Sequence, residues 1–311
     1  MTPREVHVTE VGTRDGFQME STFIPTDEKI EILNALIRSG VRSFEATSFV
    51  SPRAVPQLRD AEEVLAAIDR RPDTRIACLV PNAKGAERAA RTRIDEMVVF
   101  VSASESHNRA NVNRSIQESL DGFRDVAEVA RGAGIGLHGA VAVAFGCPFE
   151  GEVPVERVVA MVESILALGA SGISLGDTTG MATPPIVRTL VSALRDRFPG
   201  IELALHLHNT RGLGLVNVVT GLELGIDRFE SSIGGLGGCP FAPGASGNIC
   251  TEDLVFLLHE LGVSTGIDLD ALIEVSRRTE SVIGRTLPGQ VMKAGTLRAL
   301  HSLDGARRAI G

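Results

Sequence analysis

The sequence predicts an α/β protein in which eight parallel strands close into a (β/α)8 TIM barrel, with additional helices after the last strand. Short β-branched runs alternate with longer amphipathic stretches along the 311-residue chain, and eight such runs can be counted. This alternation is typical of parallel strands joined by helical crossovers. Polar or charged residues also end nearly every run, which is where a barrel collects its functional groups.

The expected strands are spread from the N-terminus to about three quarters of the way along the chain. They begin near Val6, Val41, Arg75, Met97, Ile135, Gly172, Ile201 and Arg228. A helical pattern follows each of them, and boundary residues mark several helices. Thr26, Asp27 and Glu28 open the first helix by offering side chains to its free amides, Ser39-Gly40 closes it, and Leu168-Gly169 and Leu224-Gly225 are similar ends.

The chain after the eighth strand is expected to remain helical. A helix begins at Thr251 and runs to about Leu261, and a polar helical region continues from Asp268 to the C-terminus. We therefore expect one domain, residues 1–311, with the barrel over about 5–263 and a capping or dimer-forming extension over about 264–311. Length alone also allows two domains.

A doubly wound open sheet would give a similar alternation of strands and helices. No glycine-rich phosphate-binding fingerprint follows the first strand, however, and Gly12–Gly16 carries Arg14 and Asp15 instead. The positions of the polar residues at strand ends therefore favour the barrel.

Composition narrows the classes of function. The net charge of −8 and the pI of about 5.5, without a run of basic residues, argue against a nucleic-acid partner. No apolar run is long enough to span a bilayer, and Met1–Val6 lacks the features of a signal or transit peptide, so we expect a cytoplasmic protein without a membrane partner. The chain has four cysteines and no CxxC pair, so all four are expected to be thiols. Cys78, Cys147 and Cys250 are expected to be core residues, and Cys239 is considered separately below.

The pattern His206-Leu207-His208 suggests a metal site, because residues two apart on a strand project to the same side. Asp15 follows the first strand, Asn248 follows a glycine-rich stretch after the eighth, and strands one, seven and eight are near neighbours in a closed barrel. Two nitrogens and two oxygens suit Mg²⁺ or Mn²⁺, while Zn²⁺, Co²⁺ and Fe²⁺ also bind imidazole pairs. In the alternative, Asp15 is a turn residue and Asn248 caps a helix.

Four segments carry a family resemblance over almost the whole chain. Val11–Gln18 resembles the opening motif of metal-dependent TIM-barrel lyases and condensing enzymes. Phe44–Pro52, Ser174–Thr178 and Gly234–Ala242 are similar to the 3-hydroxy-3-methylglutaryl-CoA lyase family, and the last segment is the most specific. The resemblance implies a divalent-metal-dependent carbon–carbon lyase that acts on an acyl-CoA, as a homodimer, in leucine degradation.

The resemblance also implies a role for each matching residue. Asp15, His206, His208 and Asn248 would hold the metal, and the metal would ease loss of the proton from the C3 hydroxyl. Arg14 would face the enolate oxygen of the departing thioester, and Cys239 would relay a proton to the enolate carbon. Further catalytic and substrate-binding residues are expected at the same end of the barrel: Glu45, Asp177, Gln18, Met19, His138, Ala140, Ser174 and Thr178.

Several of these positions depart from the family pattern. Met19 stands in place of asparagine, and His138–Ala142 (HGAVA) stands in place of Arg-Gly-Tyr-Val-Ser. These changes remove polar groups, so we expect a roomier and more apolar pocket, and a substrate with a bulkier or less polar C3 substituent than methyl. Asn209 and Glu230 replace aspartates common in the family, an exchange that we interpret as tolerated variation around the metal site.

Two other functions remain open at this stage. A Claisen-type condensing enzyme or pyruvate-dependent aldolase of the same superfamily would run related enolate chemistry, although the Gly238-Cys239-Pro240 loop argues against it. A barrel without catalysis could serve as a binding module. The complete set of expected metal and catalytic residues argues against that second function.

Overall fold

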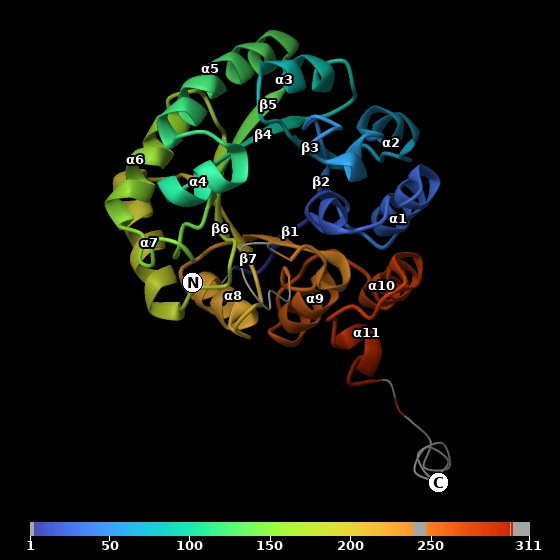
Figure 1. Cartoon of the computed structure of the whole chain (residues 1–311). Helices are drawn as coiled ribbons and strands as arrows, with labels where there is room; N and C mark the ends of the chain where they lie inside the picture. Colours follow the sequence, from blue (N-terminus) through green and yellow to red (C-terminus); the bar gives the residue numbers. More distant parts are fainter. Residues whose placement is uncertain (1–2, 239–246, 299, 301–311) are drawn as a thin grey trace.

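The computed structural model describes residues 3–238, 247–298 and 300, and in them the eight strands form a closed parallel barrel. Each strand pairs with the next in the chain, and β1 pairs with β8 to close the ring (Figure 1). The predicted fold class is therefore confirmed. The strands are β1 (His7–Glu10), β2 (Ser43–Ser48), β3 (Arg75–Leu79), β4 (Glu96–Ser102), β5 (Gly136–Ala142), β6 (Gly172–Asp177), β7 (Glu202–Leu207) and β8 (Arg228–Ser231).

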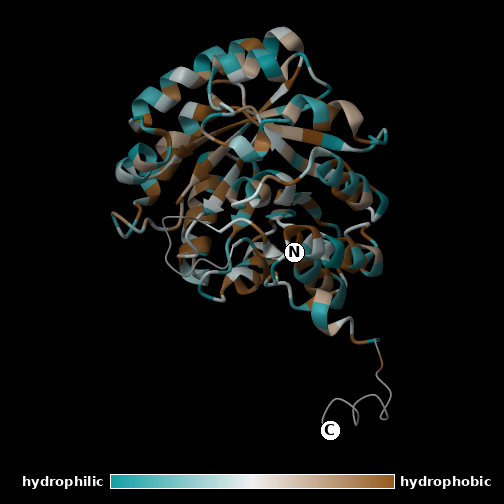
Figure 2. Cartoon of the chain, turned by 45° about the vertical axis from the view of Figure 1, so that its right-hand side comes forward, coloured by the Kyte–Doolittle hydropathy of each residue, from teal (hydrophilic) through white to brown (hydrophobic). Residues whose placement is uncertain are grey.

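Helices surround the barrel, and their apolar faces pack against the outer face of the strands. Figure 2 shows hydrophobic residues along the strands and hydrophilic residues on the outward faces of the helices. None of the helices in the described part of the chain is long and apolar enough to cross a membrane. The helices are α1 (Thr26–Arg38), α2 (Ala61–Ala67), α3 (Ala83–Ala89), α4 (Glu105–Val112), α5 (Ile116–Ala133), α6 (Val155–Leu166), α7 (Pro184–Arg197), α8 (Gly214–Glu223), α9 (Thr251–Glu260), α10 (Leu269–Ile283) and α11 (Val291–Ala294).

The first helix begins and ends where the sequence predicts, but Thr26 does not cap it. The N-cap residue is Pro25, and the Thr26 hydroxyl donates instead to Asp60, 2.8 Å away. At the other end Gly40 adopts a φ of +106°, a conformation that favours glycine.

The region from Asp268 onward, which we expected to be helical throughout, is interrupted within its described residues. Helix α10 ends at Gly284, which has a φ of +75°, and Pro288 follows before the short helix α11. The buried face of α10 packs against α1, α9 and the turn Ile233–Gly235 at the end of β8. The C-terminal region thus packs against the segment that follows β8.

Strand alternation separates two sets of side chains. On β7, Leu205 and Leu207 are fully buried in the core between strands and helices, while His206 points into the barrel. Three of the four cysteines, Cys78, Cys147 and Cys250, are buried free thiols, as predicted.

Candidate metal centre and active site

The site begins with a tight helical turn, Gly12–Gly16, directly after β1. The turn places Arg14 and Asp15 side by side at the end of the barrel. Arg14 Nη1 lies 2.6 Å from Asp15 Oδ1, and Arg14 Nη2 lies 2.8 Å from Glu45 Oε2 on β2. Burial lowers the pKa of Arg14, but the carboxylates of Glu45 and Asp15 raise it by more than burial lowers it. The pKa therefore lies above its ordinary value, and the guanidinium keeps its charge.

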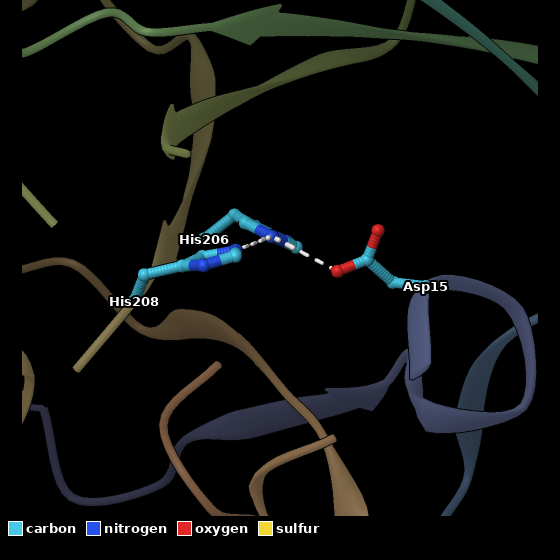
Figure 3. Close-up of side chains that lie close together, drawn as sticks. All are labelled: Asp15, His206 and His208. Atoms are coloured by element: carbon cyan, nitrogen blue, oxygen red, sulfur yellow. Dashed lines mark hydrogen bonds and ion pairs between the residues drawn. The ribbon is translucent and has the colours of Figure 1, made fainter. Parts of the chain in front are cut away.

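Asp15 faces His206 on β7 and His208 just after this strand, across the barrel mouth (Figure 3). The Nε2 atoms of His206 and His208 are 3.2 Å apart, and His206 Nε2 is 4.0 Å from Asp15 Oδ2. One ligand atom from each of the three residues lies within 4.8 Å of the others. Two ligands on neighbouring corners of an octahedron around a small divalent cation are about 3 Å apart, which agrees with the spacing of the two nitrogens.

Asn248 joins this cluster from the segment between β8 and α9. Its Nδ2 donates to Asp15 Oδ2, 2.7 Å away, and to the Leu236 carbonyl, 2.9 Å away. Its Oδ1 is buried without a hydrogen-bond partner. Because a buried acceptor without a partner is costly, this oxygen suits a fourth metal ligand. The N-cap of α9 is Cys250, so Asn248 does not cap that helix.

The protonation states also suit a cation. Burial and the neighbouring His206 lower the pKa of His208 to about 3, which keeps this imidazole neutral. Burial raises the pKa of Asp15, but Arg14 and His206 outweigh it and hold this pKa below its ordinary value. A carboxylate, a neutral imidazole and an amide oxygen without a partner are donors that a divalent cation prefers, so the residues present fit the metal.

Two further predicted catalytic residues, Glu45 and Asp177, lie at the same rim, with different partners. Glu45 orients Arg14. Asp177 Oδ1 accepts from the backbone amides of Met181 and Ala182, while Asp177 Oδ2 is buried without a partner. Burial raises the pKa of Asp177 to about 7, although those two amides lower it. Cys239 lies outside the described residues.

The predicted substrate-binding residues divide into two groups. Gln18 and Thr178 are partly exposed: Gln18 donates to Asp15 Oδ1 at 3.2 Å, and the Thr178 hydroxyl accepts from the Val143 amide at 3.0 Å. Met19 is exposed and Ala140 is partly exposed. In contrast, His138 and Ser174 are buried and bond each other inside the barrel.

Two residues that are not among the predicted site residues support the cluster. Glu230 Oε2 is 2.8 Å from His206 Nδ1, a contact that depends on the pairing of β7 with β8. Gly237 has a φ of +93°, and a Cβ there would lie 2.6 Å from Asn248 Nδ2 and 2.8 Å from Asp15 Oδ2. The signal for Gly237 was the glycine-rich composition of its segment, and the signal for Glu230 was its departure from the expected aspartate.

A closed (β/α)8 barrel whose strand ends carry an Asp-His-His cluster beside a buried arginine defines a TIM-barrel enzyme with a candidate divalent-metal centre. Residues 5–278 match the family model described as HMGL-like. The chain belongs to this family, and the predicted resemblance is confirmed.

Known relatives cover nearly the full length of the chain. Hydroxymethylglutaryl-CoA lyase of Bacillus subtilis (strain 168) is 45% identical over 288 residues, 93% of this chain and 96% of that protein. The mitochondrial hydroxymethylglutaryl-CoA lyase of Bos taurus is 41% identical, over 91% of this chain and 90% of that protein. The solved structure of an HMG-CoA lyase from Acinetobacter baumannii, in complex with coenzyme A and 3-methylmalate, has a TM-score of 0.93 at 48% identity and covers 96% of this chain and 98% of that chain.

Proposed function

We propose that the protein cleaves the C2–C3 bond of 3-hydroxy-3-methylglutaryl-CoA, or of a close 3-hydroxyacyl-CoA analogue, by retro-aldol chemistry. The products are acetyl-CoA and a keto acid, which is acetoacetate for the first substrate. The relatives named as HMG-CoA lyases, at 41–45% identity over more than nine tenths of the chain, support this reaction.

The observation that carries the proposal is the convergence of Asp15, His206 and His208 within 4.8 Å, with the free Asn248 Oδ1 beside them. These four residues would hold the cation. A divalent cation bound there supplies a Lewis acid for the C3 hydroxyl and an adjacent substrate oxygen. Mg²⁺ or Mn²⁺ suits the mixed nitrogen and oxygen donors best, and Zn²⁺ or Co²⁺ is also compatible with them.

Arg14 stabilises the charge that develops on the substrate. When the C2–C3 bond breaks, its electron pair moves onto the thioester as an enolate. Glu45 and Asp15 hold the Arg14 guanidinium at 2.8 Å and 2.6 Å, so the position of this positively charged group is fixed before the reaction begins. Such preorganised charge needs no rearrangement in the transition state.

Two protons move in the reaction. The C3 hydroxyl loses one as the keto acid forms, and Asp177 Oδ2, buried without a partner and with a pKa of about 7, is suited to accept it. The enolate carbon gains the other, and we assign that step to the Cys239 thiol on the resemblance alone. The reaction thus needs no oxidant or reductant.

A bulkier C3 substituent is a second candidate, because the inner wall near the mouth is apolar. Phe100 on β4 pairs with Ala140 on β5, and alternation places both side chains, with Ala142, inside the barrel. All three are partly exposed there. His138, by contrast, is 8% exposed and bonded to Ser174, so its side chain is turned away from this wall.

Incubation with a panel of 3-hydroxyacyl-CoA esters and Mg²⁺ or Mn²⁺, followed by mass spectrometry for acetyl-CoA, tests the reaction and the substrate together. We expect acetyl-CoA and acetoacetate from 3-hydroxy-3-methylglutaryl-CoA. A higher kcat/KM for an ester with a larger apolar C3 group would establish the second candidate. Free CoA from acetyl-CoA and 2-oxo acids, without cleavage of any ester, would instead indicate a condensing enzyme.

We further propose that residues 1–311 form one domain, that the protein is a cytoplasmic homodimer and that it acts in leucine degradation. Packing of α10 on α1 and α9 supports the first point, and the family resemblance supports the others. Size-exclusion chromatography with light scattering tests the dimer, which should elute at twice the chain mass of 32.9 kDa.

A further inference from the structure

A line of hydrogen bonds crosses the inside of the barrel and ends at a candidate metal ligand. His138 Nε2 on β5 lies 2.8 Å from Ser174 Oγ on β6. The Ser174 hydroxyl bonds Glu230 Oε1 on β8, and Glu230 Oε2 lies 2.8 Å from His206 Nδ1 on β7. The four side chains come from four strands, and all are largely buried.

The chemistry of the four groups fixes the direction of each bond. The two oxygens of Glu230 lie within hydrogen-bond distance of the Ser174 hydroxyl and of His206 Nδ1, and the oxygens of a carboxylate accept such bonds. Ser174 must therefore donate its only hydroxyl proton to Glu230. Its oxygen can then only accept from His138, which makes His138 Nε2 the donor.

The same logic sets the tautomer of His206. Its Nδ1–H donates to Glu230, so Nε2, the atom that faces His208 and Asp15, is the ring nitrogen left to offer a lone pair to a metal. An imidazole that ligates a metal usually donates its other ring N–H to such a partner, which fixes both the tautomer and the ring orientation.

We propose that His138, Ser174 and Glu230 act together as a positioning relay for His206, and that His138 and Glu230 are one coupled departure from the family pattern. The proposal rests on the metal centre proposed above. Glutamate is one methylene longer than aspartate, and here its two oxygens span the gap between Ser174 and His206. Arginine at position 138 would instead place a permanent charge beside Glu230 and compete with His206 for its carboxylate.

A double-mutant cycle on Mn²⁺ affinity tests this coupling. The full-length protein is freed of metal with EDTA and titrated with Mn²⁺ while free Mn²⁺ is followed by electron paramagnetic resonance. We expect Glu230→Ala to weaken binding by roughly 10–100-fold, and His138→Ala to weaken it by several-fold. The double variant should bind no more weakly than Glu230→Ala, because His138 acts only through Glu230.

Two further variants separate positioning from a general loss of structure. His138→Gln keeps an N–H donor near the position of Nε2 and should restore affinity, whereas Ser174→Ala should match His138→Ala. His259→Ala is the matched control, since this histidine of α9 is exposed and its side chain bonds Thr265, away from the barrel mouth. The variant should bind Mn²⁺ like the parent protein. Thermal unfolding of each metal-free variant checks that it is folded.

An unchanged affinity in His138→Ala would overturn the relay, and so would penalties that multiply in the double variant, since both mean that His138 acts independently of Glu230. Failure of the parent protein to bind Mn²⁺ would refute the metal centre itself, and the relay with it. The two failures are therefore distinguishable.

Discussion

Glutamine in place of Glu10 is expected to favour the folded protein more at pH 8 than at pH 5. Glu10 is fully buried at the end of β1, outside the barrel, where it joins three segments. Its Oε1 accepts from the amides of Gly12 and Ile233 at 2.7 Å and 2.9 Å, and its Oε2 accepts from the Thr251 hydroxyl at 2.6 Å. Burial outweighs these three bonds and raises its pKa from 4.5 to about 7.

The raised pKa of Glu10 determines how the stability of the parent protein changes with pH. The neutral carboxyl is favoured in the folded state, so the stability it contributes is fully present below pH 4.5 and is lost as the pH rises through 7. At about 1.4 kcal/mol for each pKa unit, the penalty relative to a group that stays neutral is about 1 kcal/mol at pH 5 and about 3 kcal/mol at pH 8. Glutamine stays neutral and retains an oxygen for the two amides.

The assay compares the free energies of unfolding of the parent and Glu10→Gln at pH 5 and pH 8, without metal. The chain lacks Trp and Tyr, so urea unfolding is followed by far-ultraviolet circular dichroism. Any fixed cost of the amide cancels between the two pH values, which leaves a difference of about 2 kcal/mol in favour of glutamine at pH 8. Glu63→Gln, at an exposed position of α2, is the control and should show no such difference. An equal effect of Glu10→Gln at both pH values would refute the reasoning, because the three donors would then favour the ionised carboxylate.

Three predictions concern the metal centre and catalysis. EDTA should abolish cleavage and Mn²⁺ restore it, and Asp15→Ala should weaken Mn²⁺ binding in calorimetry by about 100-fold or more; unaltered affinity would favour a different metal site. Arg14→Lys should lower kcat by on the order of 10²–10³ in the acetyl-CoA assay while Mn²⁺ still binds, and an unchanged kcat would exclude its role at the enolate. Gly237→Ala should weaken Mn²⁺ binding, because its Cβ would lie 2.6 Å from Asn248 Nδ2. Gly200→Ala is its control, with a φ of +80° and open space around the added Cβ, and equal affinities in the two variants would contradict the packing argument.

The barrel was predictable because its signals are local. Each strand and helix is marked by its own periodicity and boundary residues, and all eight strands begin within two residues of the expected positions. The capping role assigned to Thr26 was wrong because its hydroxyl finds Asp60, a partner 34 residues away that no local pattern reveals. The C-terminal helical region is interrupted at Gly284 and Pro288, two residue types that commonly end helices. The prediction missed this interruption because the sequence on both sides of it has a helical periodicity.

The metal cluster was predictable for a related reason. Period-two alternation places His206 and His208 on one side of β7, and closure of the barrel places β8 and β1 beside that strand. Both statements follow from the strand count and the topology. The partner of each histidine, however, depends on how far one strand is shifted along the next, and residue type says little about that shift.

Glu230 shows what this difference means for departures from a family pattern. Considered alone, the glutamate at position 230 and the histidine at position 138, where the family resemblance leads us to expect aspartate and arginine, are two unrelated differences, 92 residues apart in the sequence. The register of β5 with β6 pairs Ala140 with Ser174 and lets the ring of His138 reach the Ser174 hydroxyl. The register of β7 with β8 sets Glu230 opposite His206. Only when both registers are known do the two substitutions meet at one hydroxyl group, which is why they are best tested as a pair.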